Sequence, residues 1–371
     1  MTTEGTVARR SSRSPRLATK LLALAIALAC AGALAEAMVR VAHPGFPGFR
    51  LPQVEHRPIP GIGFEMVPNQ QAYTWASPAR INSLGFRGAE PRNPPGRPLV
   101  LCVGDSMTFG NGVEESDTFT FQLQQLMQRQ WPETRPETRN MGVQRYFTYQ
   151  ELELIKRYAL RLKPDIVTLS VYVNDLGLRP SGDYVKEYED EREKAATAFH
   201  NAFPTLYLLI KNSATIETMK NIYLGSSGRR TIGQRALDGE ITANDEPKWR
   251  TVEEDLTTFR QLADMYGFKP YVVFVPSRRQ VRTDMPNSAY PRRFVEHART
   301  QRLTTIAPID AFKRELAAGH DPYLPWDDHM SAVGHRLVAE AIMEQVRQTR
   351  HDTDAAVAPA GRQVAQQQVQ Q

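Results

Sequence analysis

The chain of 371 residues contains 41% hydrophobic and 23% charged residues. This balance excludes a wholly disordered or fibrous protein, and the length is sufficient for a large core and a cleft. The formal net charge of +5 comes from basic residues ahead of an apolar N-terminal segment, so the body is close to neutral and we expect no nucleic-acid partner. Cys30 lies in that apolar segment and Cys102 in a predicted buried strand, so we expect no disulfide between them.

The N-terminal region predicts export. Residues 1–20 are basic and are expected in the cytoplasm, and residues 21–39 are apolar or small apart from Glu36. As a helix this segment would reach about 28 Å, close to the roughly 30 Å of a hydrocarbon core, which favours a single-pass anchor in a bacterial inner membrane. Residues 33–35 also fit a signal cleavage site, which would release the body. Both interpretations place the body in the periplasm or beyond.

Residues 40–96 are rich in proline and glycine, which predicts an extended linker and N-terminal extension, with INSLGFRG at 81–88 typical of a tight, ordered element. Strands and helices alternate over residues 97–350, as in one large domain. Buried strands are predicted at 98–103, 139–143, 165–173, 270–275 and 303–309. Helices are predicted at 117–130, 148–162, 251–267, about 289–300 and 331–348. Residues 180–245 predict a helical insertion, and the low-complexity residues 351–371 predict a disordered tail.

This alternation predicts a three-layer α/β/α sandwich with about five parallel strands. In open sheets of this kind, functional groups lie beyond the carboxyl ends of the strands. The first strand leads into GDSMTFGNG, which puts Ser106 at such an end. Gly104 allows the sharp exit, and a following helix would direct free N–H groups toward the negative charge that develops when a serine attacks a carbonyl. The alternative is a plain strand-to-helix turn capped by Asp105 or Ser106.

A nucleophilic serine needs a base, and PWDDHMSAVGHRL supplies His329 at the start of the last predicted helix. Asp327, two residues earlier, is suited to orient the imidazole. Asp328 adjoins the histidine, and adjacent residues generally project elsewhere, so we favour Asp327 as the acid. His335 lies inside the helix, where we expect it to pack or to cap.

Two further strand ends supply candidate donors to an oxyanion. Gly142 ends the second predicted strand, where no side chain obstructs its backbone N–H, and Asn174 follows the third, where its side-chain amide can donate. A turn glycine and an Asx turn are the structural alternatives. Because these residues follow successive strands, the sheet would bring them to one edge.

Residues of these types in this order resemble the SGNH hydrolases of the GDSL superfamily. GDSMTFG matches the first conserved block of that family, Gly142 the glycine of the second, VND the asparagine of the third, and DDH the histidine of the last. The resemblance implies a flavodoxin-like sheet with Ser106 as nucleophile, His329 as base and Asp327 as acid. It also implies an oxyanion hole formed by the N–H groups of Ser106 and Gly142 and by Asn174 Nδ2.

The sequence departs from the family pattern at Trp326, because many members carry the acid three residues before the histidine. The acid would then come from an Asp-x-His arrangement, which is similar to that of alginate and other exopolysaccharide O-acetyltransferase relatives. INSLGFRG is similar to a segment of membrane-anchored bacterial SGNH proteins. The resemblance therefore implies the chemistry more firmly than the substrate.

Together these features predict an exported serine esterase or O-acyltransferase that forms an acyl-enzyme on Ser106 and acts on small acyl groups, foremost acetyl, of envelope or secreted glycans. The expected partners are an O-acylated carbohydrate or another small ester and, through the N-terminal helix, the membrane. No metal and no cofactor are expected, and Cys102 is expected to be a buried strand residue. Two alternatives stay open: a lipase or lysophospholipase with residues 200–224 as an apolar lid, and a non-catalytic component of a polysaccharide export system.

Overall fold

Five parallel strands, in the order β6-β5-β7-β8-β9, form the central sheet. The computed structural model describes residues 15–42, 44–46, 48–91, 96–177, 179, 191–226, 232–240, 242–283, 285 and 288–368. The strands are β5 (Leu99–Gly104), β6 (Glu137–Gly142), β7 (Ile166–Val171), β8 (Lys269–Phe274) and β9 (Thr304–Ile306). β5 and β7 are buried at every residue because helices cover both faces of the sheet, which explains their nearly unbroken apolar sequences.

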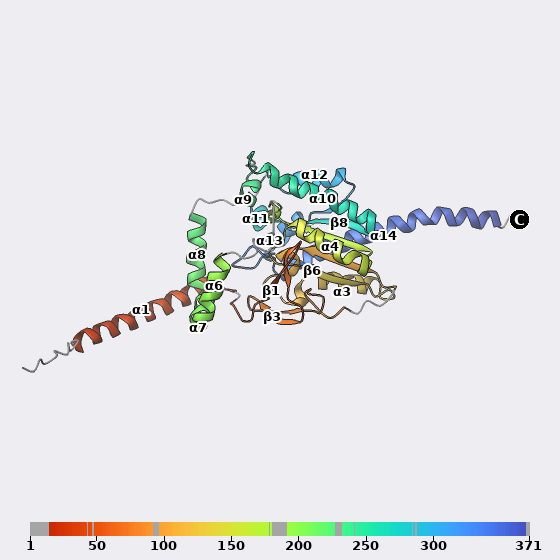
Figure 1. The fold of residues 1–371 in the computed structure, drawn as a ribbon. Coiled ribbons are helices and arrows are strands. Elements are labelled where there is room, and N and C mark those ends of the chain that lie inside the picture. Colours follow the sequence, from red (N-terminus) through yellow and green to blue (C-terminus); the bar gives the residue numbers. More distant parts are fainter. Residues whose placement is uncertain are drawn as a thin grey trace, which may run out of the picture.

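The helices form two layers around this sheet (Figure 1). On one face α3 (Phe119–Gln130) packs with α14 (Ala332–Gln368), and the other face carries α4 (Thr148–Leu162), α10 (Glu246–Tyr266) and α12 (Arg292–Thr300). In α4, the buried Leu152, Ile155 and Ala159 recur at helical spacing, and burying each large side chain contributes about 1.5–3 kcal/mol. The predicted three-layer α/β/α sandwich with five parallel strands is confirmed.

Residues 40–96 differ from the expected extended linker, because they contain two antiparallel hairpins. These are β1 (His56–Ile59) with β2 (Gly63–Met66), and β3 (Gln70–Thr74) with β4 (Ser77–Ile81). In β4, buried Ala79 and Ile81 alternate with exposed residues, as in a strand with one covered face. Gln150 of α4 donates from Nε2 to the Ile62 carbonyl at 2.7 Å, so the hairpins dock on the body.

Helix α1 (Pro15–Ala42) extends away from the body (Figure 1). Its apolar stretch, Leu17–Ala42, is longer than the expected 21–39, and by length and composition it suits either a single membrane crossing or a signal sequence. Residues 1–14 of the predicted basic N-terminus lie outside the described residues.

The described part of the insertion over residues 180–245 is mainly helical. Its helices are α6 (Glu191–Ala202), α7 (Pro204–Lys211), α8 (Ala214–Ser226) and α9 (Ile232–Leu237). Residues 180–190, 227–231 and 241 lie outside the described part. The predicted disordered tail also differs, because α14 continues as a helix to Gln368. The alanines and glutamines of this low-complexity stretch are strong helix formers, so its composition is compatible with a helix.

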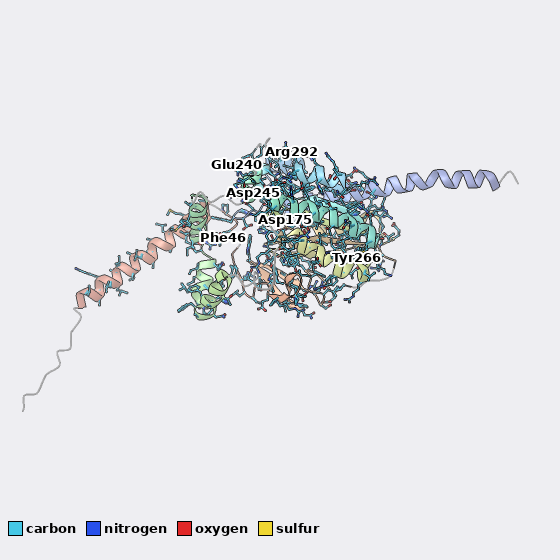
Figure 2. All side chains as sticks on the ribbon, turned by 45° about the horizontal axis from the view of Figure 1, so that its top comes forward. Phe46, Asp175, Glu240, Asp245, Tyr266 and Arg292 are labelled. Atoms are coloured by element: carbon cyan, nitrogen blue, oxygen red, sulfur yellow. The ribbon has the colours of Figure 1, made fainter. Side chains whose placement is uncertain are left out.

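The carboxyl edge of the sheet faces the α1 side of the molecule. Phe46, shortly after α1, packs edge to face on Trp326 with ring centroids 5.5 Å apart, and Trp326 directly precedes Asp327. Tyr266, which ends α10 just before β8 begins, lies on the side of the body away from α1 (Figure 2). The strand ends that carry the predicted site therefore point toward α1.

Candidate active site

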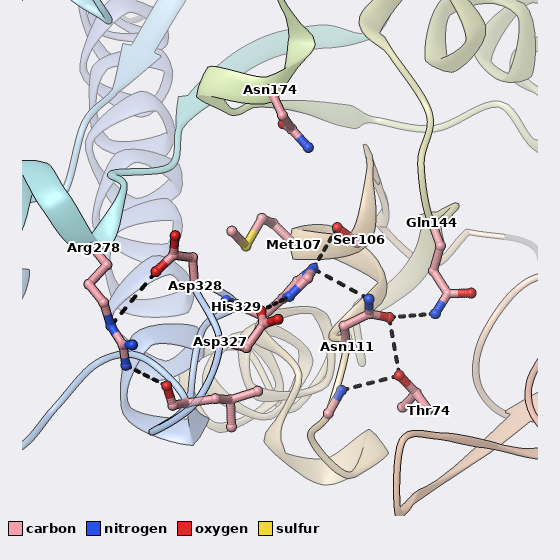
Figure 3. Close-up of polar contacts among 12 residues, drawn as sticks. Thr74, Ser106, Met107, Asn111, Gln144, Asn174, Arg278, Asp327, Asp328 and His329 are labelled. Carbon is pink, nitrogen blue, oxygen red and sulfur yellow. Dashed lines mark hydrogen bonds and ion pairs between the residues drawn. The ribbon is translucent and has the colours of Figure 1, made fainter. Parts of the chain in front are cut away.

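The strands bring the predicted site residues to one edge of the sheet (Figure 3). Ser106 follows β5, Gly142 ends β6, and Asn174 follows β7 in a short 3-10 helix, Val173–Asp175. His329 lies in the loop ahead of α14 and meets Ser106 across 223 sequence positions.

The turn after β5 is tight because Gly104 lies directly against Thr108. A Cβ at Gly104 would be 2.1 Å from Thr108 Oγ1, so no other residue fits without displacing it. Asp105 caps α2 (Ser106–Phe109), because its Oδ1 accepts the backbone N–H of Met107 at 2.8 Å. The capped turn that sequence analysis left as an alternative is therefore present, and Ser106 is the first residue of the helix that it caps.

Ser106, His329 and Asp327 form a connected series of hydrogen bonds. Ser106 Oγ lies 2.8 Å from His329 Nε2. On the other side of the ring, Nδ1–H donates to Asp327 Oδ1, which also accepts the backbone N–H of His329 at 2.9 Å. A carboxylate can only accept, so it holds the proton on Nδ1 and leaves the lone pair on Nε2 for the serine hydroxyl. This is the protonation state of a general base.

The electrostatics of the site favours transfer of a proton to His329. Burial by itself would lower the pKa of His329, but the hydrogen bond and charge of Asp327, with smaller effects of Asp105 and Asp328, raise that pKa above its ordinary value. Burial would raise the pKa of Asp327, but the two hydrogen bonds from His329 and the charges of His329 and Arg278 together outweigh burial, so this pKa is lowered. Asp327 therefore stays ionised and stabilises an imidazolium.

The two neighbouring candidates have other environments. The Asp328 side chain is 71% exposed, and its Oδ1 lies 4.0 Å from Arg278 Nε, away from the imidazole. His335 is buried, stacks on Phe119 and accepts the backbone N–H of Phe119 at 3.2 Å. Burial lowers the pKa of His335 to about 3, so it is a neutral packing residue.

Asn174 is oriented toward the serine. Its exposed side chain extends toward Ser106 and Met107 (Figure 3). Its Nδ2 donates to Asp105 Oδ2 at 3.0 Å, which fixes the orientation of the amide. One carboxylate thus holds both the helix that begins with Ser106 and the amide beside it.

Gly142 has a different environment from the one expected of an oxyanion donor. Its backbone N–H donates to Asn140 Oδ1 at 3.0 Å and is therefore paired within the fold. A Cβ at Gly142 would lie 2.1 Å from the backbone nitrogen of Phe109. The close approach of β6 to α2 explains why this position is a glycine.

Sequence analysis did not identify a second polar group at the imidazole. Asn111 Nδ2 lies 3.3 Å from His329 Nε2. Asn111 Oδ1 accepts hydrogen bonds from Gln144 Nε2 at 2.5 Å and from Thr74 Oγ1 at 3.1 Å. Asn111 belongs to GDSMTFGNG, so its position in that motif was a signal, whereas Gln144 and Thr74 belong to no motif of their own.

The β3–β4 hairpin supplies one wall of the site through Trp75. Its ring lies 5.7 Å from the His329 ring and perpendicular to it. Trp75 has a φ of 56°, a left-handed conformation that is costly for a bulky residue. The Gln53 side chain holds this conformation, because Oε1 accepts the Trp75 N–H at 3.0 Å and Nε2 donates to the Trp75 carbonyl at 2.8 Å.

Arg87, within INSLGFRG, fixes the loop that follows α2. Its buried guanidinium donates to four backbone carbonyls, those of Pro78, Phe109, Gly110 and Val113, at 3.2, 3.0, 2.6 and 2.6 Å. Asn111 lies between these acceptors in the chain. The N-terminal extension is therefore part of the site and not only a connection to it.

Other chemistries find less support among the described residues. No group of three His, Cys, Asp or Glu side chains suited to a metal ion occurs in the part of the chain that the structure describes. Cys102 is buried in β5, and burial raises its pKa to about 12, which agrees with a strand residue and not with a nucleophile.

Comparison with known proteins adds three solved structures of low identity. The first is LAE5, an alpha/beta hydrolase enzyme from the metagenome of Lake Arreo in Spain, with 15% identity and a TM-score of 0.40 over 68% of this chain and 97% of that chain. The second is the acetyl xylan esterase AlAXEase, with 15% identity and a TM-score of 0.40 over 67% of this chain and 99% of that chain. The third is Axe2, an acetylxylan esterase from Geobacillus stearothermophilus, with 16% identity and a TM-score of 0.39 over 67% of this chain and 94% of that chain. No curated protein matches the chain. The model of the GDSL-like lipase/acylhydrolase family matches residues 102–337, from β5 into α14. Since this match covers more than half of the sequence, the chain belongs to the GDSL-like lipase/acylhydrolase family of hydrolases.

Proposed function

We propose that the protein is an exported serine esterase or O-acyltransferase that forms an acyl-enzyme on Ser106 and acts on small acyl groups, foremost acetyl, of envelope or secreted glycans. The observation that carries this proposal is the connected series of Asp327, His329 and Ser106. Each hydrogen bond in it has the direction that a general base and its nucleophile need.

In the acylation step, Ser106 Oγ attacks the carbonyl carbon of the ester while His329 Nε2 takes the hydroxyl proton. The carbonyl electron pair moves onto oxygen and gives a tetrahedral oxyanion. When this intermediate collapses, the bond to the leaving alcohol breaks and His329 returns the proton to the alcohol oxygen. Asp327 keeps its charge throughout and stabilises the transient imidazolium.

The Ser106 N–H and Asn174 Nδ2 are the proposed oxyanion donors. Ser106 begins α2, where backbone N–H groups have no intrahelical acceptor. Asn174 Nδ2 carries two hydrogens, and Asp105 accepts only one, so the second is available. Gly142 contributes to this hole only if its N–H leaves Asn140 Oδ1. Loss of one such donor lowers kcat by roughly 10²–10³.

A glycan substrate is supported by the sequence and by the wall of the site. The Asp-x-His arrangement is similar to that of exopolysaccharide O-acetyltransferase relatives. Trp75, half-buried beside His329, presents a broad aromatic surface of the kind against which sugar rings pack.

We also propose that α1 is retained as a single-pass anchor with the body outside the cytoplasm. Glu36, the acidic residue in the apolar stretch, accepts the N–H groups of Ala214 and Thr215 at 2.9 and 3.0 Å and the Ser213 hydroxyl at 2.9 Å. The two N–H groups belong to the first turn of α8 and have no intrahelical acceptor, and a carboxylate is favoured at this end of a helix. A charge that interrupts an anchor helix is thereby explained by its contact with the insertion.

The first test is labelling of the full chain in detergent with a fluorophosphonate, read by intact mass. We expect one adduct on the wild type and none on Ser106→Ala. If the folded wild type forms no adduct, the proposal is contradicted and the non-catalytic alternative takes its place.

A series of p-nitrophenyl esters separates the glycan enzyme from a lipase. The lipase alternative is favoured by exposed apolar side chains on α7 and α8, among them Leu209 and Ile222. We expect a preference for acetate over decanoate. A preference for decanoate that increases with added phospholipid vesicles would favour the lipase.

A further inference from the structure

Asn111 contacts the reactive nitrogen of His329 although acylation gives it no role. Nε2 has one lone pair and two polar neighbours, Ser106 Oγ at 2.8 Å and Asn111 Nδ2 at 3.3 Å. While Ser106 carries its proton, the shorter hydrogen bond uses that lone pair. The contact between Asn111 Nδ2 and Nε2 becomes important only when Ser106 Oγ carries no hydrogen that it can donate.

The orientation of the Asn111 amide is fixed by hydrogen bonds of known direction. The backbone N–H of Gly112 donates to Thr74 Oγ1 at 3.2 Å, and the Thr74 hydroxyl donates its one hydrogen to Asn111 Oδ1 at 3.1 Å. Gln144 Nε2 donates to the same oxygen. The oxygen of the amide therefore faces Thr74 and Gln144, and its NH₂ group faces His329 (Figure 3).

The backbone around Asn111 is held from several sides. The Asn111 N–H donates to the Ser106 carbonyl at 3.2 Å, which ties it to the predicted nucleophile. Arg87 holds the carbonyls on both sides of it. At the next residue, a Cβ on Gly112 would lie 2.7 Å from Leu324 Cδ1 and 2.8 Å from the Trp75 ring. The amide is thus preorganised at the imidazole before any substrate binds.

We propose that Asn111 Nδ2 and His329 Nε2 together form the binding site for the hydroxyl group that takes the acyl group from Ser106, an inference that rests on the proposed function. The pair presents one donor and one acceptor 3.3 Å apart. A hydroxyl oxygen about 2.9 Å from both nitrogens gives its hydrogen to Nε2 and accepts one from Nδ2. Ether and carbonyl oxygens have no hydrogen for Nε2, so the pair selects water or a sugar hydroxyl.

The site acts in the second half of the reaction. In the acyl-enzyme, Ser106 Oγ is esterified and gives no proton to Nε2, so an incoming hydroxyl can donate to the Nε2 lone pair while Asn111 Nδ2 donates to the hydroxyl oxygen instead of to Nε2. The hydroxyl oxygen attacks the acyl carbon as Nε2 takes its proton, and the carbonyl electron pair moves onto oxygen. When the intermediate collapses, the bond from the acyl carbon to Ser106 Oγ breaks and Nε2 returns the proton to Oγ. Asn111 holds the attacking oxygen in place and is not itself altered.

Burst kinetics of the full chain in detergent with p-nitrophenyl acetate separate the two halves. The burst of p-nitrophenol reports acylation, and loss of the acetyl adduct from Ser106, followed by intact mass, reports deacylation. In Asn111→Ala we expect deacylation to slow about 10-fold, as for loss of one hydrogen bond between neutral groups, with acylation changed less than about threefold. Acetyl-enzyme should therefore accumulate.

Two further variants make the result independent of a folding defect. Asn111→Asp keeps the shape but replaces the donor by an acceptor, so we expect slow deacylation and, because the new charge lies beside Nε2, an acidic limb of the pH profile displaced to higher pH. Thr74→Val keeps the donor and removes one of the groups that orient it, so we expect a smaller effect in the same direction. Melting temperatures monitor the fold.

The source of the hydroxyl is read from the products. Added oligosaccharide that speeds loss of the acetyl adduct and becomes acetylated identifies a sugar acceptor, and release of acetate alone identifies water. With either acceptor, Asn111→Ala should slow the transfer.

The outcomes distinguish this inference from the proposed function. Equal slowing of both phases in Asn111→Ala and Asn111→Asp, or deacylation at the wild-type rate, overturns the hydroxyl site and leaves the serine esterase intact. Absence of any acetyl adduct and of turnover in the wild type overturns the proposed function, and the hydroxyl site with it.

Discussion

Replacing Asp327 by asparagine tests the assignment of the acid at nearly constant shape. Asp327 Oδ1 accepts two hydrogen bonds from His329, one from Nδ1–H and one from the backbone N–H. An asparagine that places its NH₂ group at the position of Oδ1 accepts neither bond, so Nδ1 must accept, the ring proton moves to Nε2, and Nε2 has no lone pair for the Ser106 hydroxyl. An asparagine that keeps its oxygen at this position retains both bonds but loses the negative charge that stabilises the imidazolium.

The expected loss in kcat/KM for p-nitrophenyl acetate is roughly 10³–10⁴, which corresponds to about 4–5.5 kcal/mol of transition-state stabilisation. The pH dependence has a definite sign. The base must be neutral, so wild-type activity falls as the pH drops through a His329 pKa that lies above its ordinary value of 6.5. Asp327→Asn removes the strongest influence that raises this pKa, so the acidic limb of the residual activity should move to lower pH.

Asp328→Asn is the matched control, because it makes the same chemical change at the adjacent residue. The Asp328 side chain is 71% exposed and its nearest cation, Arg278, is 4.0 Å away, so we expect kcat/KM within about threefold of the wild type. Fluorophosphonate labelling rates of both variants give a second readout without turnover. A similar loss in the two variants, or more than a tenth of the activity left in Asp327→Asn, would refute the reasoning.

Three further predictions follow from groups outside the immediate series. Arg87→Lys removes a guanidinium that donates to four carbonyls, so thermal melts should show a free energy of unfolding lower by about 2–4 kcal/mol, and activity should fall as well. Arg80 is exposed, so Arg80→Lys should change neither the stability nor the activity. Glu36→Ala should accelerate hydrogen exchange at the first amides of α8, measured by mass spectrometry, whereas Glu217→Ala should leave these amides unchanged. Glu151 is buried, and burial raises its pKa well above the ordinary 4.5, so the folded chain keeps a proton that the unfolded chain loses. Stability should therefore fall as the pH rises above about 5, and the melting temperature of Glu151→Gln relative to wild type should increase between about pH 5 and pH 8; a constant difference would contradict this.

Local patterns were sufficient for the fold class and for the residues of the proposed series. Each buried strand is a short apolar run that ends in a turn signal, and parallel strands end at one edge, so the position of Ser106 followed from its place after β5. The pairing of Asp327 with His329 was also local, because the two residues lie in one loop two positions apart. The same reasoning placed Asn174 at the next strand end, where its amide lies beside the serine.

Composition was a poor guide to residues 40–96. The many prolines and glycines suggested a linker, but this region also contains β-strands in which every second residue is covered by the body. A strand gains its stability from the surface on which it packs, and that surface is formed by residues distant in sequence. Trp75 and Thr74 belong to no motif, so the sequence did not indicate that they lie at the site, whereas Arg87 lies in INSLGFRG, which the sequence marked as an ordered element.

The sequence by itself determined the sheet and predicted the order of the proposed nucleophile, amide, acid and base, because each of these depends on contacts among near neighbours or on strand ends. Only the tertiary structure decided which polar groups are free to act. It pairs the Gly142 N–H with Asn140, and it places Asn111 against His329 across 218 positions. Hydrogen-bond donors and acceptors are directional and few, so a side chain's role depends on which partners the packed backbone brings within about 3 Å, and no local pattern specifies that.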